Sequence, residues 1–400
     1  MLFPWLLNPS TPRAAVAAII LSVCFLPFGA RAQQKDPVDP NFRVSPALTA
    51  SPSRIAIDPT GRVIAAGGDF LQIVNGHPQR GIARFLADGR LDHSFDCGTG
   101  FDAGGEIADV HIQTDGKILI TGTFSSFGGA ARQNILRLLE NGTVDPSYAA
   151  ATTAVSLSAI DSQNRLYVFD GVRISRLTAS GASDPDFPSY TADNTVLAMV
   201  IDSSDRLLFV EEKHVTQPIG IKNYMTTSAS ARICRLNETG DLDLAKTLWS
   251  EGGMIDHVKH VARVGLAAGS NNAFYLSVFV RYQGYGSEVG LYGPIEKWDT
   301  DGEIDLDFST DLNGEFVFDP ATEKLYVLNA VRASQEISAP RVFDDPLRIL
   351  PDGRIDPTFN SVGLSFVSPN LYIMSRINDA ALFPDGTLAV VGTATHTTAE

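Results

Sequence analysis

The densest group of acidic side chains in the sequence lies at residues 299–307. Five of these nine residues are acidic: Asp299, Asp301, Glu303, Asp305 and Asp307. Hard cations such as Ca²⁺ bind several carboxylate oxygens on a turn, so Asp299, Asp301 and Asp305 are candidate metal ligands. However, an Asp-Gly pair is also a common turn pair, and the segment lacks the acid spacing and final glutamate of a helix–loop–helix calcium site. Turn formation explains these acids better, and we expect no bound metal or other cofactor.

Histidine and glycine patterns give only weak indications of chemistry. His257 and His260 are three residues apart, and on a strand such residues point to opposite faces, which hinders joint metal binding. The glycine pairs at 104–105 and 128–129 do not precede a helix, so a phosphate-binding loop is not indicated. The sequence contains neither a Gly-x-Ser-x-Gly nor a His-Glu-x-x-His motif. We therefore predict no catalytic residue.

Oppositely charged residues recur together along the chain. The recurring arginines are Arg84, Arg137, Arg176, Arg235 and Arg348, and the aspartates that follow them are Asp92, Asp145, Asp184, Asp243 and Asp356. Because the arginines occupy one position of a repeated pattern, they could share a face that binds anions. An ion pair between each arginine and its aspartate explains the pattern better, since guanidinium and carboxylate groups match in charge and geometry.

The elements that position these residues repeat, and residues 107–148 hold the clearest copy. Two short apolar runs, 107–113 and 117–121, flank an Asp-Gly pair, which permits positive φ at both central positions of a tight hairpin turn. A second hairpin surrounds Asn141-Gly142 and ends in the closing phrase Val-Asp-Pro-Ser-Tyr, whose proline removes a backbone donor. The unit predicts four antiparallel strands, a sheet that is too small to be stable alone.

Copies of this unit fill most of the chain. Closing phrases recur at 38–42, 91–95, 144–148, 183–187, 304–308 and 355–359, with a weaker copy at 242–244. First hairpins recur at 55–64, 110–119, 157–166, 199–208, 266–276, 316–325 and 381–388. The first two intervals between closing phrases are both 53 residues, and regular spacing of this kind indicates units that stack on one another.

Seven such units predict an all-β fold, a β-propeller of about seven four-stranded antiparallel blades. A solenoid of stacked sheets is the alternative, although an open stack leaves edge strands exposed. The seventh repeat lacks an Arg-Leu strand, so either the last blade is incomplete or, as we favour, the chain is a piece of a longer protein. Residues 38–42 could join the last blade from the opposite end of the chain.

Irregular segments interrupt the repeats in three places. Residues 242–249 could form one or two helical turns, and no longer helix is expected. Long insertions at 211–230 and 281–294 depart from the repeat. Because loops on a rigid scaffold often make the functional contacts, we expect these insertions to form a variable binding surface.

Residues 1–32 predict an export signal. Arg13 precedes an apolar run at 14–26, and Ala30-Arg31-Ala32 offers small residues for cleavage before the next residue. The run is short for a membrane span, although an uncleaved anchor and a lipoprotein signal at Cys24 are alternatives. We therefore expect a secretion signal peptide at 1–32, an N-terminal segment carrying a repeat tail at 33–52, and a propeller at 53–400, with repeats near 53–95, 101–148, 152–187, 194–248, 249–308, 311–359 and 362–400.

Charge and cysteine content narrow the partners and the setting. Cleavage would change the net charge from −15 to −17, because it removes two arginines and no acidic residue. This acidity argues against nucleic acid as a partner. Cys97 and Cys234 lie in different repeats and are interpreted as unpaired thiols, since two distant cysteines do not make a disulfide framework.

The repeat resembles the delta-60 repeat of bacterial surface and secreted proteins. The residues that carry the resemblance are the Asp-Gly-Lys turn, the segment Gly-Thr-Phe-x-x-Phe-Gly-Gly, the Arg-Leu strand, the Asn-Gly turn and the closing phrase at 144–148. The match is close at 107–148, good at 53–95 and 347–359, and faint between 249 and 301. The resemblance implies a propeller-like fold and an extracellular setting, and it supplies no catalytic residues.

Two functions are consistent with the sequence. The first is an exported, non-catalytic propeller that acts in binding, adhesion or as a scaffold at or outside the cell surface, with a glycan or a protein as its ligand and no membrane span after signal cleavage. The alternative is a secreted hydrolase or lyase that acts on polysaccharide through carboxylates at the central channel. Acidic residues that converge there in glycosidase-like geometry would favour the enzyme.

Overall fold

The computed structural model describes residues 16–20, 52–148, 154–193, 195–219, 224–251, 258–284, 287–337, 346–359 and 371–398. These residues form small, mostly antiparallel sheets, and within them the only helix is the 3-10 turn η1 (Ser270–Asn272). No helix in this part of the chain has the length and hydrophobicity needed to cross a membrane.

Seven main sheets follow one another along the chain, and we call them blades 1 to 7. Blade 1 comprises β2 (Arg54–Ile57), β3 (Val63–Val74) and β4 (His77–Phe85). Blade 2 comprises β5 (Glu106–Ile112), β6 (Ile118–Thr123) and β9 (Ile135–Leu138). Blade 3 comprises β10 (Leu157–Ile160), β11 (Leu166–Phe169), β12 (Arg173–Leu177) and β13 (Tyr190–Thr191). Blade 4 comprises β14 (Thr195–Ile201), β15 (Leu207–Ile219), β16 (Tyr224–Leu236) and β17 (Leu242–Glu251).

The remaining blades complete the series. Blade 5 comprises β18 (Val258–Ala268), β19 (Phe274–Gly284), β20 (Ser287–Tyr292), β21 (Glu296–Trp298) and β24 (Ser334–Ile337). Blade 6 comprises β22 (Leu312–Asp319), β23 (Lys324–Arg332) and β25 (Leu347–Ile349), and blade 7 comprises β26 (Leu371–Leu382), β27 (Leu388–Thr398) and β1 (Val16–Ile20). A further small pair, β7 (Ser126–Phe127) and β8 (Ala130–Ala131), lies before β9.

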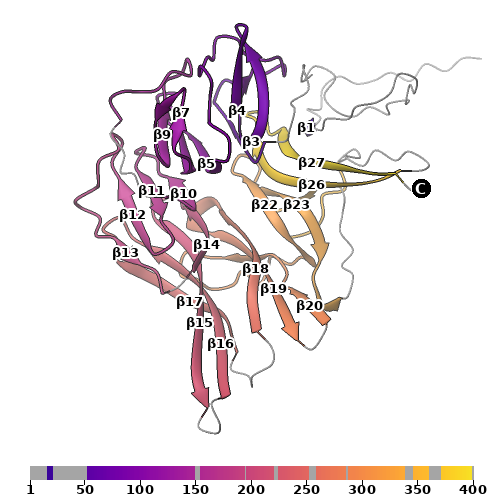
Figure 1. Cartoon of the computed structure of the whole chain (residues 1–400). Coiled ribbons are helices and arrows are strands. Elements are labelled where there is room, and N and C mark those ends of the chain that lie inside the picture. Colours follow the sequence, from indigo (N-terminus) through magenta and orange to yellow (C-terminus); the bar gives the residue numbers. More distant parts are fainter. Residues whose placement is uncertain are drawn as a thin grey trace, which may run out of the picture.

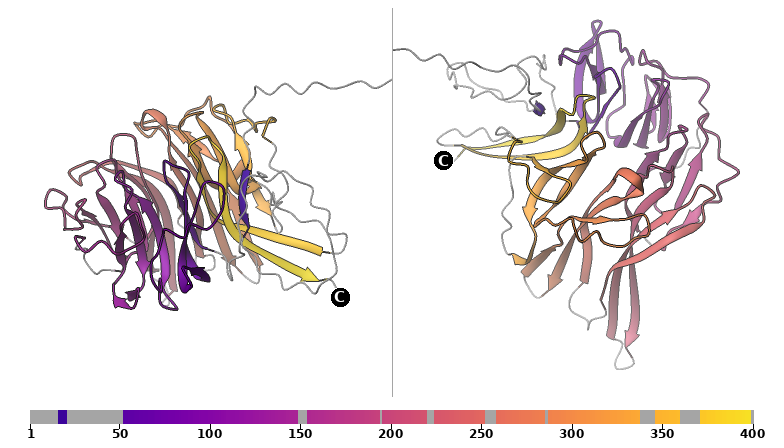
Figure 2. Two further views of the ribbon diagram at one scale, coloured as in Figure 1. Left: turned by 90° about the horizontal axis from the view of Figure 1, so that it is seen from above. Right: turned by 180° about the vertical axis from the view of Figure 1, so that it is seen from behind.

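The blades surround a common axis in sequence order, as the front and rear views show (Figures 1 and 2). The innermost strands contact one another in succession from β2 to β26, and β26 contacts β2 again. Ala389 and Val391 of blade 7 pack against Ile55 and Val63 of blade 1, which closes the ring through side-chain packing. The predicted all-β propeller is therefore confirmed.

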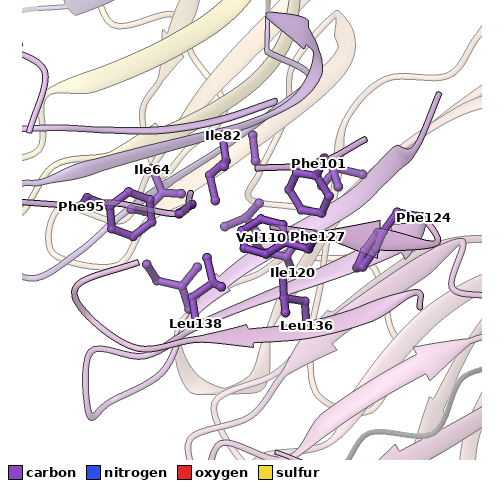
Figure 3. Close-up of a cluster of buried hydrophobic side chains, with 14 residues drawn as sticks. Ile64, Ile82, Phe95, Phe101, Val110, Ile120, Phe124, Phe127, Leu136 and Leu138 are labelled. Carbon is purple, nitrogen blue, oxygen red and sulfur yellow. The ribbon is translucent and has the colours of Figure 1, made fainter. Parts of the chain in front are cut away.

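The core lies between blades, because each sheet is buried on both faces. On β3, Val63 and Ala65 pack toward blade 7 while Ile64 packs toward blade 2, as expected from the alternation of side chains along a strand. Figure 3 shows the cluster between blades 1 and 2, in which Phe95 of the closing phrase lies near Leu138. Each fully buried side chain of this size stabilises the fold by about 1.5–3 kcal/mol.

All seven predicted first hairpins are present as antiparallel pairs, from β2 with β3 to β26 with β27. Their turns differ in detail from the expected two-residue form. In blade 2, Gly116 N donates to Gln113 O at 2.9 Å, Gln113 N donates to Lys117 O at 2.8 Å, and positive φ occurs only at Gly116 (80°), not at Asp115. The loop therefore has three residues, and only its glycine needs the left-handed conformation.

The fourth strand predicted for each blade is mostly reduced to a single bridge. Residue pairs of this kind join the third strand to the closing phrase, namely Phe85 with Leu91, Leu138 with Val144, Leu177 with Ser183, Trp298 with Ile304, and Ile349 with Ile355. The closing aspartate turns the chain away after one pair. In blade 2, Asp145 Oδ1 accepts hydrogen bonds from Ser147 N at 2.9 Å and from Ser147 Oγ at 2.6 Å.

The irregular segments form strands rather than loops or helices. Residues 242–249 lie within β17, so the expected helical turns are wrong. The insertion at 211–230 extends β15 and β16 into a long hairpin that projects from the ring (Figure 1). The insertion at 281–294 supplies β20, which pairs with β24 from the chain segment that follows β23. Residues 38–42, predicted to join the last blade, lie outside the described residues. In blade 7, β1 pairs in parallel with β27, although β1 lies within the predicted signal peptide and cleavage would remove it.

Candidate functional site between blades 1 and 2

Five of the seven innermost strands contain a bulge. The register shifts between Ile107 and Asp109, Val196 and Ala198, Val261 and Arg263, Asn313 and Glu315, and Ile377 and Asp379. A bulge interrupts the hydrogen bonding between two strands and changes the direction of the side chain that follows it. Four of the five residues that follow the bulge are charged, so the inner strands carry ionisable groups at the blade junctions.

Blades 7, 1 and 2 bring a charged cluster together at the start of β2. Arg54 Nε donates to Ala108 O of blade 2 and lies 3.7 Å from Asp109 Oδ1. On the other side, Asp379 Oδ2 of blade 7 accepts a hydrogen bond from Ile55 N at 2.9 Å. Asp109 and Asp379 therefore flank the same two residues of blade 1, although they are 270 residues apart in the sequence.

Burial changes the protonation of this cluster. It raises the pKa of Asp109 to about 6 and that of Asp379 to about 7, and the negative charge of Asp109 adds to the rise at Asp379. Arg54 opposes both shifts because its positive charge favours the ionised carboxylates. Near neutral pH, the Asp379 carboxyl is therefore protonated in part of the molecules and ionised in the rest.

A serine, a histidine and an aspartate meet nearby, but they are not ordered as a catalytic triad. Ser158 Oγ lies 2.8 Å from His111 Nε2 and 2.8 Å from Thr121 Oγ1, and it donates to Asp109 Oδ2 at 3.4 Å. In a triad the acid orients the histidine, whereas here Asp109 contacts the serine. Burial lowers the pKa of His111 to about 4, so its ring is neutral at ordinary pH. The group joins blade 2 to blade 3.

The acids of the cluster also serve as acceptors for the main chain of the next blade. Asp379 binds Ile55 N of blade 1, and Asp109 Oδ2 accepts from Ser158 N of blade 3 at 3.3 Å. Three more junctions have a comparable contact: Glu212 Oε1 accepts from Val261 N at 2.6 Å, Ser277 Oγ donates to Gly314 O at 2.7 Å, and Asn329 Oδ1 accepts from Ile377 N at 3.1 Å. These side chains therefore connect neighbouring blades.

A groove of about 530 Å³ leads outward from Arg54 between blades 1 and 2. Arg80 and the exposed acids Asp69, Asp102 and Glu106 lie along it, and Arg80 Nη1 contacts Asp69 Oδ1 at 2.7 Å. Its wall includes Gly67, where an added Cβ would lie 2.0 Å from Ser53 Oγ, so the chains approach closely only because a side chain is absent. The groove offers hydrogen-bond donors and acceptors side by side.

The predicted arginine–aspartate pairs are confirmed in all five repeats. The shortest distances are 2.7 Å for Arg84 with Asp92, 2.9 Å for Arg137 with Asp145, 2.6 Å for Arg176 with Asp184, 2.8 Å for Arg235 with Asp243, and 2.9 Å for Arg348 with Asp356. Four of the arginines also lie over the closing aromatic ring, within 4.4 to 4.8 Å of its centroid. The arginines are thus buried structural groups rather than an open anion-binding face.

The candidate metal ligands make the contacts of turn residues. Asp299 Oδ1 accepts from Asp301 N and Glu303 N, each at 2.9 Å, and Asp305 Oδ2 lies 2.8 Å from Lys297 Nζ. Asp301 is exposed. Among the described residues, no three His, Cys, Asp or Glu side chains are placed to hold a metal ion.

A calcium titration tests this assignment. We expect added Ca²⁺ or EDTA to leave the thermal midpoint unchanged, because the Asp299 and Asp305 oxygens already accept protein hydrogen bonds. Asp301→Asn should also be neutral, within about 0.5 kcal/mol, as is usual for exposed turn residues. If Ca²⁺ raises the thermal midpoint of the wild type but not that of Asp301→Asn, the segment at 299–307 binds Ca²⁺ and the assignment as a turn is wrong.

The remaining sequence candidates are two histidines, two glycine pairs and two cysteines. His257 and the side chain of His260 lie outside the part of the chain that the structure describes. Of the glycine pairs, 104–105 lines the groove, while 128–129 follows β7. Cys97 and Cys234 are buried and unpaired, as predicted, and burial raises both thiol pKa values.

Sequence reasoning missed Arg54, Asp109 and Asp379. A signal was present, because Arg54 directly precedes the first-hairpin run at 55–64 and Asp109 directly precedes the run at 110–119. Alignment of the repeats could have placed both at one position of the unit. Their proximity to Asp379 follows only once the last blade meets the first.

Several solved structures are similar to this chain at low sequence identity. Similar solved structures include a chain from the mitotic checkpoint complex (12% identity, 94% of this chain and 99% of that chain, TM-score 0.44) and a gluconolactonase from Xanthomonas campestris (12%, 74% and 88%, TM-score 0.36). Another is an ulvan lyase (9%, 86% and 92%, TM-score 0.38). Similarity at this level carries no information about function.

No curated protein matches the chain significantly. The family comparison matches parts of the first two repeats, including five of the residues that line the groove between blades 1 and 2. Residues 59–95 and 113–148 match the family model described as a β-propeller domain of unknown function, DUF5122, so the first two repeats are similar to that domain.

Proposed function

We propose that the protein is an exported, non-catalytic β-propeller that binds an extracellular glycan in the groove between blades 1 and 2. Export is supported by the predicted signal peptide at 1–32 and by the resemblance of the repeats to the delta-60 repeat. The observation that carries the binding site is the groove itself, with a volume of about 530 Å³. This volume lies within the range of about 300–1,000 Å³ that is usual for ligand sites.

Glycan binding suits the mixed polar lining of the groove. Sugar hydroxyls both donate and accept hydrogen bonds, and the guanidinium of Arg80 lies beside the carboxylate of Asp69. Asp102 and Glu106 add further exposed acceptors. A purely anionic polymer is less well matched, because these acids and the net charge of −15 would repel it.

The hydrogen bonds of Asp109 and Asp379 favour binding without turnover. Each carboxylate accepts a main-chain N–H from a neighbouring blade, so a proton transfer would have to disturb a blade junction. The raised pKa of Asp379, about 7, favours the second candidate, a polysaccharide hydrolase or lyase, because a general acid must be protonated near neutral pH. We give preference to binding because Asp379 makes structural contacts on both oxygens.

A glycan array with two arginine variants tests the site. Arg80→Ala should weaken binding of the array ligands about tenfold or more, the usual loss for a central polar contact. Arg90→Ala is the matched control, because Arg90 also forms an exposed ion pair in blade 1, with Asp88 at 2.7 Å, but lies outside the groove. Equal effects of the two variants on glycan binding would show that the glycan does not bind in this groove.

Turnover is measured separately on the glycans that bind. We expect no release of reducing ends or unsaturated products. The proposal would be wrong, and the protein an enzyme, if the wild type releases products and Asp379→Asn does not while circular dichroism shows that the variant is folded.

A further inference from the structure

Neighbouring blades are joined by hydrogen bonds on the face that carries the hairpin turns. The recurring arginine of one blade donates to a carbonyl before the second turn of the next: Arg84 to Glu140 O, Arg137 to Ala179 O at 2.6 Å, Arg176 to Glu238 O at 2.7 Å and Arg235 to Thr300 O at 2.6 Å. A tyrosine of the second strand makes a similar contact with the first turn of the next blade, Tyr167 to Asp205 O at 3.5 Å and Tyr326 to Gly386 O at 2.9 Å.

Among the described residues, blade 5 makes neither of these contacts with the next blade. Lys297 replaces the arginine, and its Nζ lies 2.8 Å from Asp305 of the same blade. Tyr275 occupies the position of the tyrosine, and burial, with a smaller contribution from the charges of Glu323 and Asp305, raises the pKa of its hydroxyl to about 12. Among the described residues, neither Lys297 nor Tyr275 forms a hydrogen bond to blade 6. A lysine lacks the fork of nitrogens that lets arginine bind its aspartate and the next blade together.

A groove of about 530 Å³ opens at this junction. Tyr275, Trp298 and Phe318 form its apolar part. Asp299 and Glu323 are exposed along it, and only Lys297 opposes the acidic charge. The groove is therefore apolar at its floor and negatively charged at its edges.

Two exposed apolar side chains border the groove. Leu306 is 89% exposed and Ile304 is 44% exposed. In the other closing phrases the position of Leu306 is occupied by Pro40, His93, Pro146, Pro185 and Pro357, and in the weaker copy by Leu244, which is buried. Ile304 and Leu306 border the same groove and lie two residues apart, so together they form a small exposed apolar patch at its edge.

We propose that the groove between blades 5 and 6 binds an extended peptide segment of a protein partner, with a basic side chain next to an apolar one. The apolar side chain packs on Leu306 and Ile304, and the basic side chain lies between Asp299 and Glu323. The negative charge of the whole protein, −15, adds a long-range attraction for basic segments. This site is separate from the groove between blades 1 and 2, because no lining residue is shared.

Fluorescence anisotropy with two labelled peptides tests the proposal. The probe alternates arginine and leucine, and the matched peptide alternates glutamate and leucine. The arginine peptide should bind at least about tenfold more tightly, and Leu306→Glu should abolish most of that binding. Val172→Glu is the control, because Val172 is another exposed apolar residue, at 58%, in blade 3. Equal binding of the two peptides, or no binding of either, would overturn the proposal.

A second variant tests why the groove exists. Lys297→Arg restores the recurring arginine, which should reach the Pro351 carbonyl of blade 6 and narrow the groove. We expect this variant to bind the arginine peptide several-fold more weakly than the wild type while its thermal midpoint rises. Unchanged peptide binding together with an unchanged midpoint would contradict the assignment of the groove to the missing arginine.

Discussion

Replacing Arg137 with alanine should lower the free energy of unfolding by about 3–5 kcal/mol, the usual cost of removing one partner from a buried ion pair. Arg137 binds Asp145 through Nε at 3.0 Å and through Nη2 at 2.9 Å, and it donates to Ala179 O of blade 3. Its guanidinium also lies 4.4 Å from the centroid of the Tyr148 ring. One substitution therefore leaves a buried carboxylate with only Lys117 Nζ, at 4.0 Å, as a charged partner, and it removes a contact between two blades.

Urea unfolding of two further variants separates the charge from the geometry. Arg137→Lys keeps the charge but cannot bridge both blades, so its loss of stability should fall between those of the wild type and Arg137→Ala. Arg90→Ala breaks an ion pair in which the arginine is 72% exposed, and it should cost no more than about 1 kcal/mol. If Arg137→Ala costs no more than Arg90→Ala, the recurring pair does not hold the blades together.

The pair also predicts instability in acid. Burial raises the pKa of Asp145, but hydrogen bonds from Ser147 and the charge of Arg137 outweigh this effect and hold the pKa below its usual value. Because the folded pKa is lowered, the stabilisation is present above the unfolded pKa and is lost as the pH falls through the folded pKa.

The repeated parts of this structure could be predicted because each is specified locally. Turn pairs such as Asp115-Gly116 mark the hairpins, and the apolar runs beside them supply the strands. The arginine–aspartate pairs were also accessible, since Arg137 and Asp145 lie on adjacent segments of one unit. Errors arose where a side chain decides the local path: Asp145 binds Ser147 N, and so the fourth strand ends after one bridge.

The candidate sites could not be predicted because they depend on how blades meet. Arg54, Asp109 and Asp379 come from three blades, and only ring closure brings them together. The groove between blades 5 and 6 lies beside Lys297, at a position where other repeats carry arginine, and it forms only where blade 6 meets blade 5. Likewise, β24 pairs with β20 of the preceding blade, and no local pattern indicates that exchange.

Asp379 should make the protein more stable at about pH 5 than at about pH 8. Its folded pKa, about 7, lies above the ordinary value, so the folded protein binds more protons than the unfolded chain between these pH values. The stabilisation is fully present below the unfolded pKa and is lost as the pH rises through the folded pKa. One pKa unit corresponds to about 1.4 kcal/mol, so Asp379 and Asp109 together should contribute on the order of 3 kcal/mol across this range.

Asparagine at position 379 removes the titration but keeps an oxygen that can accept the hydrogen bond from Ile55 N. Asp379→Asn should therefore raise stability at about pH 8, where the ionised carboxylate is costly, and flatten the dependence of the urea midpoint on pH. Asp385→Asn is the matched control in the same blade, because Asp385 is exposed and accepts from Thr387 N at 2.9 Å. A slope that is the same in the wild type and Asp379→Asn would show that the contact between blades 7 and 1 does not depend on this proton. A steeper slope in Asp379→Asn would contradict the prediction, because the charges and hydrogen bonds around Asp379 would then outweigh burial and favour the ionised form.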